Sequence, residues 1–411
     1  MREMKDSGYS WIGKIPTDWS MGRVKNAFVR KNEKAMKEDP VILSLARSGV
    51  RIRDVSNNEG QIAESYFNYN PVLEGDLLLN PMDLYSGANC SISKVSGVIS
   101  PAYINLKSNN EINSNFYDYY FKIQYWLMAF FSYGKGVSFE NRWTLNIETL
   151  MNYPVVMMSY KEQCKRANLL DDKCTKIDSI VAKQQMIVEK LLKYKQATIT
   201  EMVINEKWPI YRLRHCINKI EQGWSSPAAE TVDDINGWFV LSLSAIKGGK
   251  FNYEARKPID SDANIPENLQ IRGGDFLMTR SNTRELVGDV CVVTECVTKT
   301  IFSDLIYRIT FDELLVTEYA RYLLQSAFVR QQIQESARGS SGTMPKISHK
   351  AIKEIKVYLP SVNEQRILLN KLDEKVNKID LIIKKKQALI DKILAYKKSL
   401  IYEVVTGKRE V

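Results

Sequence analysis

Apolar residues recur every three or four positions along two long stretches of the chain. From Leu170 to Met202 and from Leu372 to Val404 the steps alternate between four and three, which is the heptad pattern of a coiled-coil helix. Forty helical residues span roughly 60 Å, so each stretch predicts one long helix. The apolar positions of the predicted contact seam are Leu170, Ile177, Val181, Val188, Leu191, Leu372, Ile379, Ile383, Ile390 and Ile393.

The two stretches are copies of each other, 202 positions apart. Residues 162–205 align with 364–407 without gaps and share about 19 of 44 residues. The seam is polar at matching places, for example at Lys195 and Lys397, and polar seam residues fix the register of a coiled coil. Each helix needs an apolar partner and the other copy is the nearest candidate, so we expect the two to pack together. The alternative is that each helix only covers its own globular domain.

The segments before each helix follow the pattern of strands and turns. Short apolar runs, such as 41–45 and 240–243, are separated by Gly, Asn and Asp, as in a sheet with tight connections. Gly75-Asp76-Leu77 matches Gly274-Asp275-Phe276, so the repeat includes these segments. The sequence therefore predicts an α+β fold with a pseudo-twofold internal repeat. Its predicted parts are a first globular domain (1–157), a first spacer helix (158–207), a second globular domain (208–359) and a second spacer helix (360–411).

Charge is concentrated in the repeated helices. The chain has 411 residues and a net charge of +10, which suits a nucleic-acid partner. Residues 161–208 contain 10 basic and 7 acidic side chains, and residues 361–411 contain 12 and 7. The globular domains are nearly balanced, so they would have to contact DNA through a polarised face. No apolar run is long enough to span a membrane and the N-terminus lacks a signal-peptide pattern, so we expect a cytoplasmic protein.

Residue types needed for catalysis or metal binding are sparse. The two histidines, His215 and His349, exclude a three-histidine metal site, and a catalytic triad would need one of them. The six cysteines are scattered without a CxxC pair. The GxxxxGK[ST] and GxGxxG motifs of nucleotide-binding proteins are absent. We predict no catalytic residue and no metal site in this chain.

Three stretches carry a resemblance to one family. They are DSGYSWIGKIPTDWSMGRV at 6–24, YLPSVNEQRILLNKLDEKVNKIDLII at 358–383 and SLIYEVVTGK at 399–408. Together with the order of domains and helices, they make the chain resemble the specificity (S) subunit of type I restriction–modification enzymes over essentially its whole length. The resemblance implies two target-recognition domains, each reading one half of a bipartite site in double-stranded DNA. It also implies that the two coiled-coil helices are antiparallel and set the gap between the half-sites.

The same resemblance implies partners that perform the chemistry of restriction and DNA methylation. Methyltransferase (M) subunits, expected in two copies, would dock on the helices and bring S-adenosylmethionine. Restriction (R) subunits would bring ATP and magnesium for translocation and cleavage. The chain itself would be a non-catalytic DNA-binding subunit without a cofactor, in the cytoplasm of a bacterium or archaeon.

Polar loops beside the strands hold the candidate DNA contacts, because donors and acceptors there can reach base edges and phosphates. In the first globular domain the candidates are Arg47, Arg51, Asn80, Asp83, Tyr85, Ser86, Lys135, Ser138 and Arg142. In the second they are Gln222, Thr279, Arg280, Ser281, Asn282, Arg284, Arg338, Ser340, Thr343 and Lys346. The stretch TRSNTRE at 279–285 is the strongest, since Arg pairs well with guanine and Asn with adenine. We expect Trp143 and Trp224 to pack within their loops.

Two other function classes remain open from the residues alone. A self-contained restriction or methylation enzyme would act without a partner when given S-adenosylmethionine or magnesium. A coiled-coil interaction protein without a DNA role would bind its partner regardless of DNA sequence. True DNA binding through phosphates should weaken steeply as salt rises.

Overall fold

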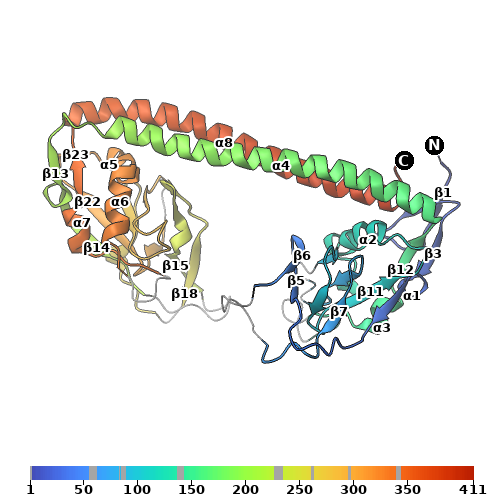
Figure 1. The fold of residues 1–411 in the computed structure, drawn as a ribbon. Coiled ribbons are helices and arrows are strands. Elements are labelled where there is room, and N and C mark those ends of the chain that lie inside the picture. The colour runs from blue at the N-terminus through green and yellow to red at the C-terminus, as the bar shows by residue number, and fades with distance from the viewer. Residues whose placement is uncertain are drawn as a thin grey trace. The chain divides into compact units, whose positions relative to one another are not determined.

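The computed structural model describes residues 2–54, 63–82, 84, 89–136, 143–225, 235–260, 263–294, 298–338 and 344–411. The chain forms two compact units, a first unit of Met1–Gln184 with Leu389–Val411 and a second unit of Gln185–Ala388. Each unit contains one globular domain and parts of both long helices, α4 (Tyr160–Val203) and α8 (Val362–Val405) (Figure 1). This confirms the α+β fold with two long helices. The exact division into four segments stays a prediction.

The two long helices run antiparallel within each unit, and matched ion pairs fix their register. In the first unit Lys397 of α8 contacts Asp178 of α4 at 2.6 Å. In the second unit Lys195 of α4 contacts Asp380 of α8 at 2.9 Å. Asp178 and Asp380 are repeat equivalents, as are Lys195 and Lys397. The polar seam positions are therefore used twice in the same way, and a shift of one helix along the other would break both pairs.

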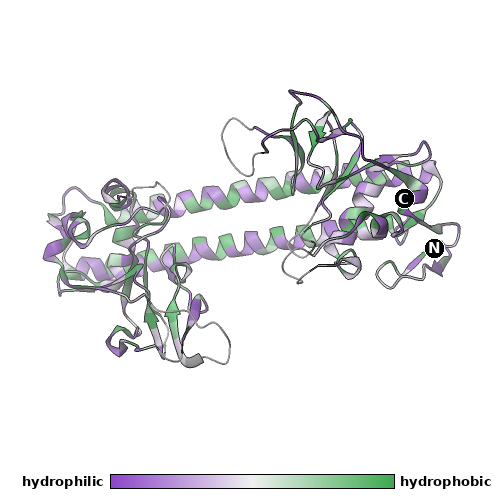
Figure 2. Cartoon of the chain, turned by 90° about the horizontal axis from the view of Figure 1, so that it is seen from below, coloured by the Kyte–Doolittle hydropathy of each residue, from purple (hydrophilic) through white to green (hydrophobic). Residues whose placement is uncertain are grey.

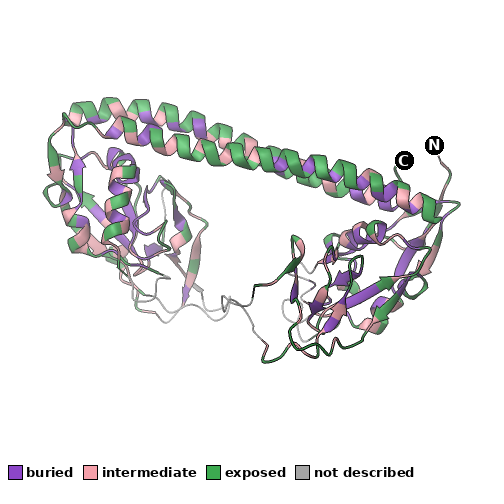
Figure 3. Ribbon diagram, in the orientation of Figure 1, coloured by how far each residue is buried: buried purple, intermediate pink, exposed green. Residues whose placement is uncertain are grey.

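Hydrophobic residues recur along both helices (Figure 2), and buried positions recur with them (Figure 3). Leu170, Ile177 and Val181 of α4 are buried, as are Leu372, Ile379 and Ile390 of α8. The remaining predicted seam residues are half-buried; they are Val188, Leu191, Ile383 and Ile393. The seam of the heptad pattern is thus the side of each helix that is removed from solvent.

The first globular domain centres on a four-stranded antiparallel sheet of order β4-β11-β8-β9. A second pair, β3 with β12, brings the two ends of the domain together, and α2 lies against β9. The strands are β1 (Met4–Asp6), β2 (Lys14–Pro16), β3 (Ser20–Arg23), β4 (Phe28–Lys31), β5 (Leu43–Ala46), β6 (Gly49–Ile52), β7 (Asn70–Val72), β8 (Leu77–Leu79), β9 (Cys90–Ile92), β10 (Gly97–Ile99), β11 (Ile104–Ser108) and β12 (Pro154–Met157). The short helices are α1 (Val24–Ala27), α2 (Ser114–Trp126) and α3 (Ile147–Met151).

The second globular domain repeats this topology. Its four-stranded sheet has the order β14-β22-β19-β20, β13 pairs with β23 at the domain ends, and α5 lies against β20. The strands are β13 (Ile210–Arg212), β14 (Ile217–Gln222), β15 (Ile235–Leu241), β16 (Ile246–Lys247), β17 (Lys250–Phe251), β18 (Arg256–Asp260), β19 (Phe276–Thr279), β20 (Val290–Val292), β21 (Thr300–Phe302), β22 (Ile306–Phe311) and β23 (Lys356–Tyr358). The short helices are α5 (Thr317–Gln325), α6 (Ala327–Ser336) and α7 (His349–Glu354).

The repeated Gly-Asp sequence forms the same turn in both domains. Gly75 and Gly274 adopt positive φ angles of 90° and 89°, which favour glycine. The Asp76 carboxylate accepts the backbone N–H of Leu73 at 2.8 Å, and the Asp275 carboxylate accepts that of Arg272 at 2.9 Å. The aspartate thus closes the turn that leads into β8 or β19, which explains why both copies keep it.

A buried glutamine attaches each long helix to its globular domain. Gln163 of α4 is 1% exposed; its amide oxygen accepts the N–H of Asn113 at 2.8 Å, and its amide nitrogen donates to the Glu111 carbonyl at 3.2 Å. Gln365 of α8 is 0% exposed and makes the equivalent bonds, to the N–H of Val316 at 2.9 Å and the Leu314 carbonyl at 2.8 Å. A buried amide needs these partners, so the Glu-Gln sequence that both copies share holds the helix on the domain.

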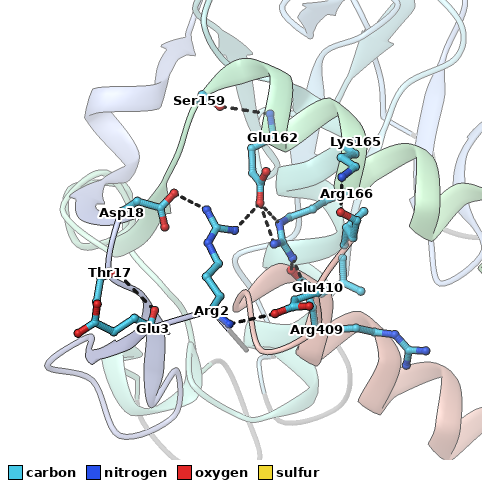
Figure 4. A network of polar contacts seen from close by, with 12 residues as sticks. Arg2, Glu3, Thr17, Asp18, Ser159, Glu162, Lys165, Arg166, Arg409 and Glu410 are labelled. Carbon is cyan, nitrogen blue, oxygen red and sulfur yellow. Dashed lines mark hydrogen bonds and ion pairs between the residues drawn. The ribbon is translucent and has the colours of Figure 1, made fainter.

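The first unit contains a polar junction around Arg166, shown in Figure 4, and the repeat equivalent of this arginine in the second unit is Leu368. Arg166 of α4 is 1% exposed and donates to the Val404 carbonyl at 2.8 Å, the Arg409 carbonyl at 3.0 Å and the Glu162 carboxylate at 2.8 Å. Arg2 donates to the same Glu162 oxygen at 2.8 Å. Although burial raises the pKa of Glu162, the hydrogen bonds from Arg2 and Arg166 lower it overall. The N-terminus and the C-terminus of the chain are thereby joined to the start of α4.

Replacing Arg166 with leucine, the residue at the equivalent position 368 of the second copy, is expected to destabilise the first unit by about 3 kcal/mol. The change leaves two carbonyls and a carboxylate without their buried partner. Urea denaturation followed by tryptophan fluorescence measures the effect, because the Arg166 guanidinium lies 4.7 Å from the ring of Trp19. The exposed Lys161→Leu variant is the control and should change stability by less than about 0.5 kcal/mol.

The difference in the free energy of unfolding between the wild type and Arg166→Leu should depend on pH. The pKa of Glu162 is lower in the folded than in the unfolded protein, so its contribution is complete above the unfolded-state pKa of about 4.3 and is lost as pH falls through the folded-state pKa. Equal stability of Arg166→Leu and wild type at neutral pH would show that the junction does not hold the unit together.

Candidate DNA interface

Three polar loops of the second globular domain meet at one end of its sheet. Strand β19 runs into Arg280, whose carbonyl accepts the N–H of Ile347 at 2.9 Å. Lys346 pairs in an antiparallel bridge with Arg338. Gln222, at the end of β14, lines one small cavity together with Arg280 and Lys346. The fold therefore brings together candidate residues from three stretches that lie more than fifty residues apart in the sequence.

The first globular domain has the same connection between loops. The Leu145 N–H donates to the Pro81 carbonyl at 2.9 Å, matching the bond between Ile347 and Arg280. The Asn89 side chain donates to the Ala46 carbonyl at 2.7 Å, which ties the β5–β6 hairpin to the loop after β8. The candidates that the structure describes in this domain are Arg47, Arg51, Asn80 and Lys135. Arg47, Arg51 and Lys135 are exposed, and Asn80 is half-buried.

Two candidates of the second domain are buried and cannot reach DNA. Thr279 and Ser281 are both 0% exposed, and the Thr279 hydroxyl donates to the Leu286 carbonyl at 2.9 Å. Residues along an extended strand alternate between its faces, so Arg280 lies on the opposite side from its two neighbours. The prediction of DNA contact is therefore wrong for Thr279 and Ser281, because strand alternation turns them into the core.

The other described candidates of this domain keep access to solvent. Gln222, Arg284, Arg338 and Lys346 are exposed, while Arg280 and Asn282 are half-buried. The Asn282 side-chain oxygen accepts the N–H of Thr283 at 2.9 Å, so a local turn orients its amide. Asp83, Tyr85, Ser86, Ser138, Arg142, Ser340 and Thr343 lie outside the described residues. DNA contact by the accessible residues stays a prediction.

Trp143 packs within its loop, as expected. Its indole N–H donates to the Phe131 carbonyl at 2.7 Å, and the two rings lie 5.5 Å apart. Both contacts join Trp143 to the segment that carries Lys135, and the Trp143 carbonyl accepts the N–H of Leu84, in the loop after β8, at 3.2 Å. The indole is thus used for positioning rather than for stacking on a base.

Tyr307 and His349 line the same cavity as Gln222, Arg280 and Lys346, although neither was a candidate. Tyr307 lies on β22 and its hydroxyl donates to the Ile347 carbonyl at 3.2 Å. Ser348 caps α7 by accepting the N–H of Ala351, so His349 is the first residue of this helix. No sequence pattern marks the two residues as site residues, because only the tertiary fold places them beside Arg280.

Neither a metal cluster nor a membrane helix is found in the part of the chain that the structure describes. Within those ranges no three His, Cys, Asp or Glu side chains gather as a metal site. Likewise, no helix there is both long and apolar enough to cross a bilayer. The chemistry that the described loops offer is hydrogen bonding by arginine, lysine, asparagine and glutamine.

The sequence comparisons find DNA specificity proteins of type I restriction enzymes. Residues 248–391 match the family model of the type I restriction modification DNA specificity domain. The EcoKI specificity subunit of Escherichia coli K12 is 23% identical over 335 residues, covering 78% of this chain and 69% of the relative. The MjaVIII specificity subunit of Methanocaldococcus jannaschii is 22% identical over 434 residues, covering 97% and 94%.

The fold is also similar to that of a solved protein chain. That chain comes from work on complex assembly and conformational transition of the type I R-M system. The TM-score is 0.66 at 13% identity, and the match covers 96% of this chain and 99% of the solved one. At this identity the similarity concerns the fold alone.

Proposed function

This chain belongs to the specificity subunits of type I restriction–modification systems, and we propose that each of its globular domains reads one half of a bipartite DNA site. The long helices set the gap between the half-sites and dock two methyltransferase subunits. The observation that carries this proposal is the repetition of whole structures within one chain. The four-stranded sheet, the Gly-Asp turn, the buried glutamine and the ion pair of the helices all occur twice.

Exposed apolar residues on the long helices support the docking of two partners. Ile180, Ile187 and Tyr194 follow one another at heptad spacing along α4, next to the seam, and are 46%, 37% and 61% exposed. A two-helix coiled coil needs apolar residues only at its seam, whereas a wider apolar face is typical of helices that pack in a larger bundle. We call these three residues the α4 stripe.

The repeat places an equivalent set on the other helix. Ile382, Leu389 and Tyr396 of α8 are 44%, 41% and 52% exposed, and each matches an α4 stripe residue at an offset of 202. We call them the α8 stripe. Two stripes of the same chemistry favour two copies of one partner over a single asymmetric partner. The partner that this family supplies is the methyltransferase subunit.

The partners supply the cofactors in this proposal. S-adenosylmethionine binds to the methyltransferase subunits, and ATP with magnesium binds to restriction subunits where these join the complex. The residues of this chain contribute recognition and assembly. The chain itself acts as the non-catalytic subunit, which its family assignment shows.

Lysine substitutions in the stripes test the assembly. In a complex co-expressed with its methyltransferase, native mass spectrometry should find two partner copies on the wild type. Ile180→Lys with Ile187→Lys should leave one copy, Ile382→Lys with Leu389→Lys should also leave one, and the combination should leave none, because charges oppose burial of the stripe.

Ala182→Lys is the matched control for these variants. Ala182 is exposed, and its repeat equivalent is already a lysine, Lys384, so the added charge should leave two copies bound. Retention of two copies by the combined stripe variant would contradict docking on the stripes. A complex that binds DNA without sequence preference would contradict the reading of half-sites.

A further inference from the structure

The second globular domain has a cavity of about 200 Å³ at the meeting point of its three polar loops. A water molecule occupies roughly 30 Å³, so the cavity is large enough to admit the edge of a ligand. Its lining residues are Gln222, Arg280, Tyr307, Lys346, Ile347, Ser348 and His349. Five elements or loops contribute to it, and each is held by backbone bonds of the domain.

One polar atom of a residue that lines this cavity lacks a protein partner. The Nε2 atom of His349 is buried and has no hydrogen bond within the described part of the chain. The imidazole packs against the Tyr307 ring, with centres 4.5 Å apart, so its position is fixed. A buried polar group without a partner is costly.

The charged groups around the cavity favour a ligand with acceptor atoms. Arg280 and Lys346 line it, and no carboxylate belongs to its described lining. Burial, together with the charges of Lys353 and Arg280, lowers the pKa of His349. The imidazole is therefore neutral at neutral pH and offers one donor and one acceptor.

The arginine is already oriented before any ligand arrives. Its Nη1 atom donates to the Asp304 carbonyl at 3.2 Å, and its guanidinium carbon lies 6.0 Å from the centre of the Tyr307 ring. A side chain held in this way loses less conformational freedom on binding. Arginine donating to the N7 and O6 atoms of guanine is the commonest specific contact between protein and base.

We propose that this cavity receives the N7 and O6 edge of a guanine in the half-site that the second domain reads, with Arg280 and Lys346 as donors and His349 as a further base-contacting residue. The proposal rests on the proposed function and deepens it. Glutamine and a neutral imidazole each have an acceptor as well as a donor, which suits the mixed polar edge of a base pair, whereas a phosphate presents only acceptors.

Three of the residues that line this cavity are replaced by different residue types in the first domain. The matched loop bond makes Pro81 equivalent to Arg280 and Leu145 equivalent to Ile347. From Leu145 the repeat offset of 202 makes Thr144 equivalent to Lys346 and Ile147 equivalent to His349. The cavity is therefore not a structural requirement of the fold. The two domains should read different bases with the same framework.

The test uses the complete complex with its methyltransferase and duplexes that carry the mapped target site. Each guanine of the second half-site is replaced in turn by 7-deazaguanine, which lacks only the N7 acceptor. Fluorescence anisotropy should find one position where this weakens wild-type binding by roughly 10- to 100-fold. Arg280→Ala and His349→Ala should bind the natural duplex more weakly than the wild type does. Replacing that guanine by 7-deazaguanine should then weaken the binding of these variants little further, because the contact has already been removed by the substitution.

Lys353→Gln is the matched control. It removes a nearby positive charge from α7 without changing the cavity lining, so the 7-deazaguanine effect should persist. Thermal unfolding of each variant separates a folding defect from a binding defect.

Three results would overturn the proposal. A second half-site without guanine on either strand excludes the ligand. Arg280→Ala could weaken binding to target and unrelated duplexes equally and leave the 7-deazaguanine effect intact. That result would show that the cavity binds a backbone phosphate and not a base. Unchanged discrimination in His349→Ala removes the histidine from the site. If wild-type complex fails to prefer any site, the proposed function itself fails, which the same titration shows.

Discussion

Removing one heptad from both long helices together is expected to shorten the gap in the recognised DNA site by about three base pairs. Seven helical residues span about 10 Å, and base pairs rise by 3.4 Å. The segments to delete are 181–187 and 383–389, which are repeat equivalents. They lie between the register-fixing ion pairs, so Asp178 can still meet Lys397 and Lys195 can still meet Asp380. A deletion of seven residues also preserves the direction of the seam to within about 20°.

The methylated site of the shortened protein shows the outcome. A narrower gap, or loss of methylation because the half-sites no longer face the same side of the duplex, agrees with the account. Deletion from α4 alone is the control, because it sets the matched ion pairs out of register and should prevent assembly. Duplicating both segments should widen the gap while keeping the exposed stripes. An unchanged gap in the doubly shortened protein would contradict the role of the helices as a spacer.

Exchanging residues 208–359 for the equivalent domain of a relative should replace one half of the recognised site and leave the other half unchanged. The structure makes this exchange possible because the domain ends meet in the β13–β23 pair, and both strands lie within the exchanged segment. The hydrogen bonds that the Gln365 side chain makes to the domain go to backbone atoms, at Val316 and Leu314. A domain with a different sequence but the same backbone can therefore accept the helix.

Genome-wide mapping of methylated sites measures the result of the exchange. The first half of the site should persist in every strain, and the second should become that of the donor. The reciprocal exchange of residues 20–157 serves as the control and should change only the first half. A site that changes in both halves after one exchange would contradict independent reading by the two domains.

The helices could be predicted closely from the sequence because their information is local. The heptad steps mark the seam, and the polar interruption at Lys195 and Lys397 marks the register that the ion pairs to Asp380 and Asp178 fix. The strands that flank the Gly-Asp turns were also apparent. In each case the residues that decide the structure lie close together in the sequence or recur at a constant offset.

Features that depend on distant residues could not be predicted in this way. In the sequence Arg166 is one of many basic residues on a predicted helix. Only the fold brings the carbonyls of Val404 and Arg409 within hydrogen-bonding distance of its guanidinium. Thr279 and Ser281 have the sequence of a polar loop, whereas in the structure Thr279 ends β19, Ser281 forms a bridge with Lys346, and both side chains are buried. His349 reads as the start of a helix, which it is, and its contact with Tyr307 depends on a strand forty residues earlier.

The most direct test of the account is a base-resolution methylation map of the host genome with this gene intact and deleted. The account predicts a split motif with a fixed gap that is methylated in the intact strain and unmethylated after deletion. Expression of the gene from a plasmid should restore the same motif. A methylation pattern that is identical in both strains, while the methyltransferase partner is expressed, would contradict the role of this chain in selecting the DNA site.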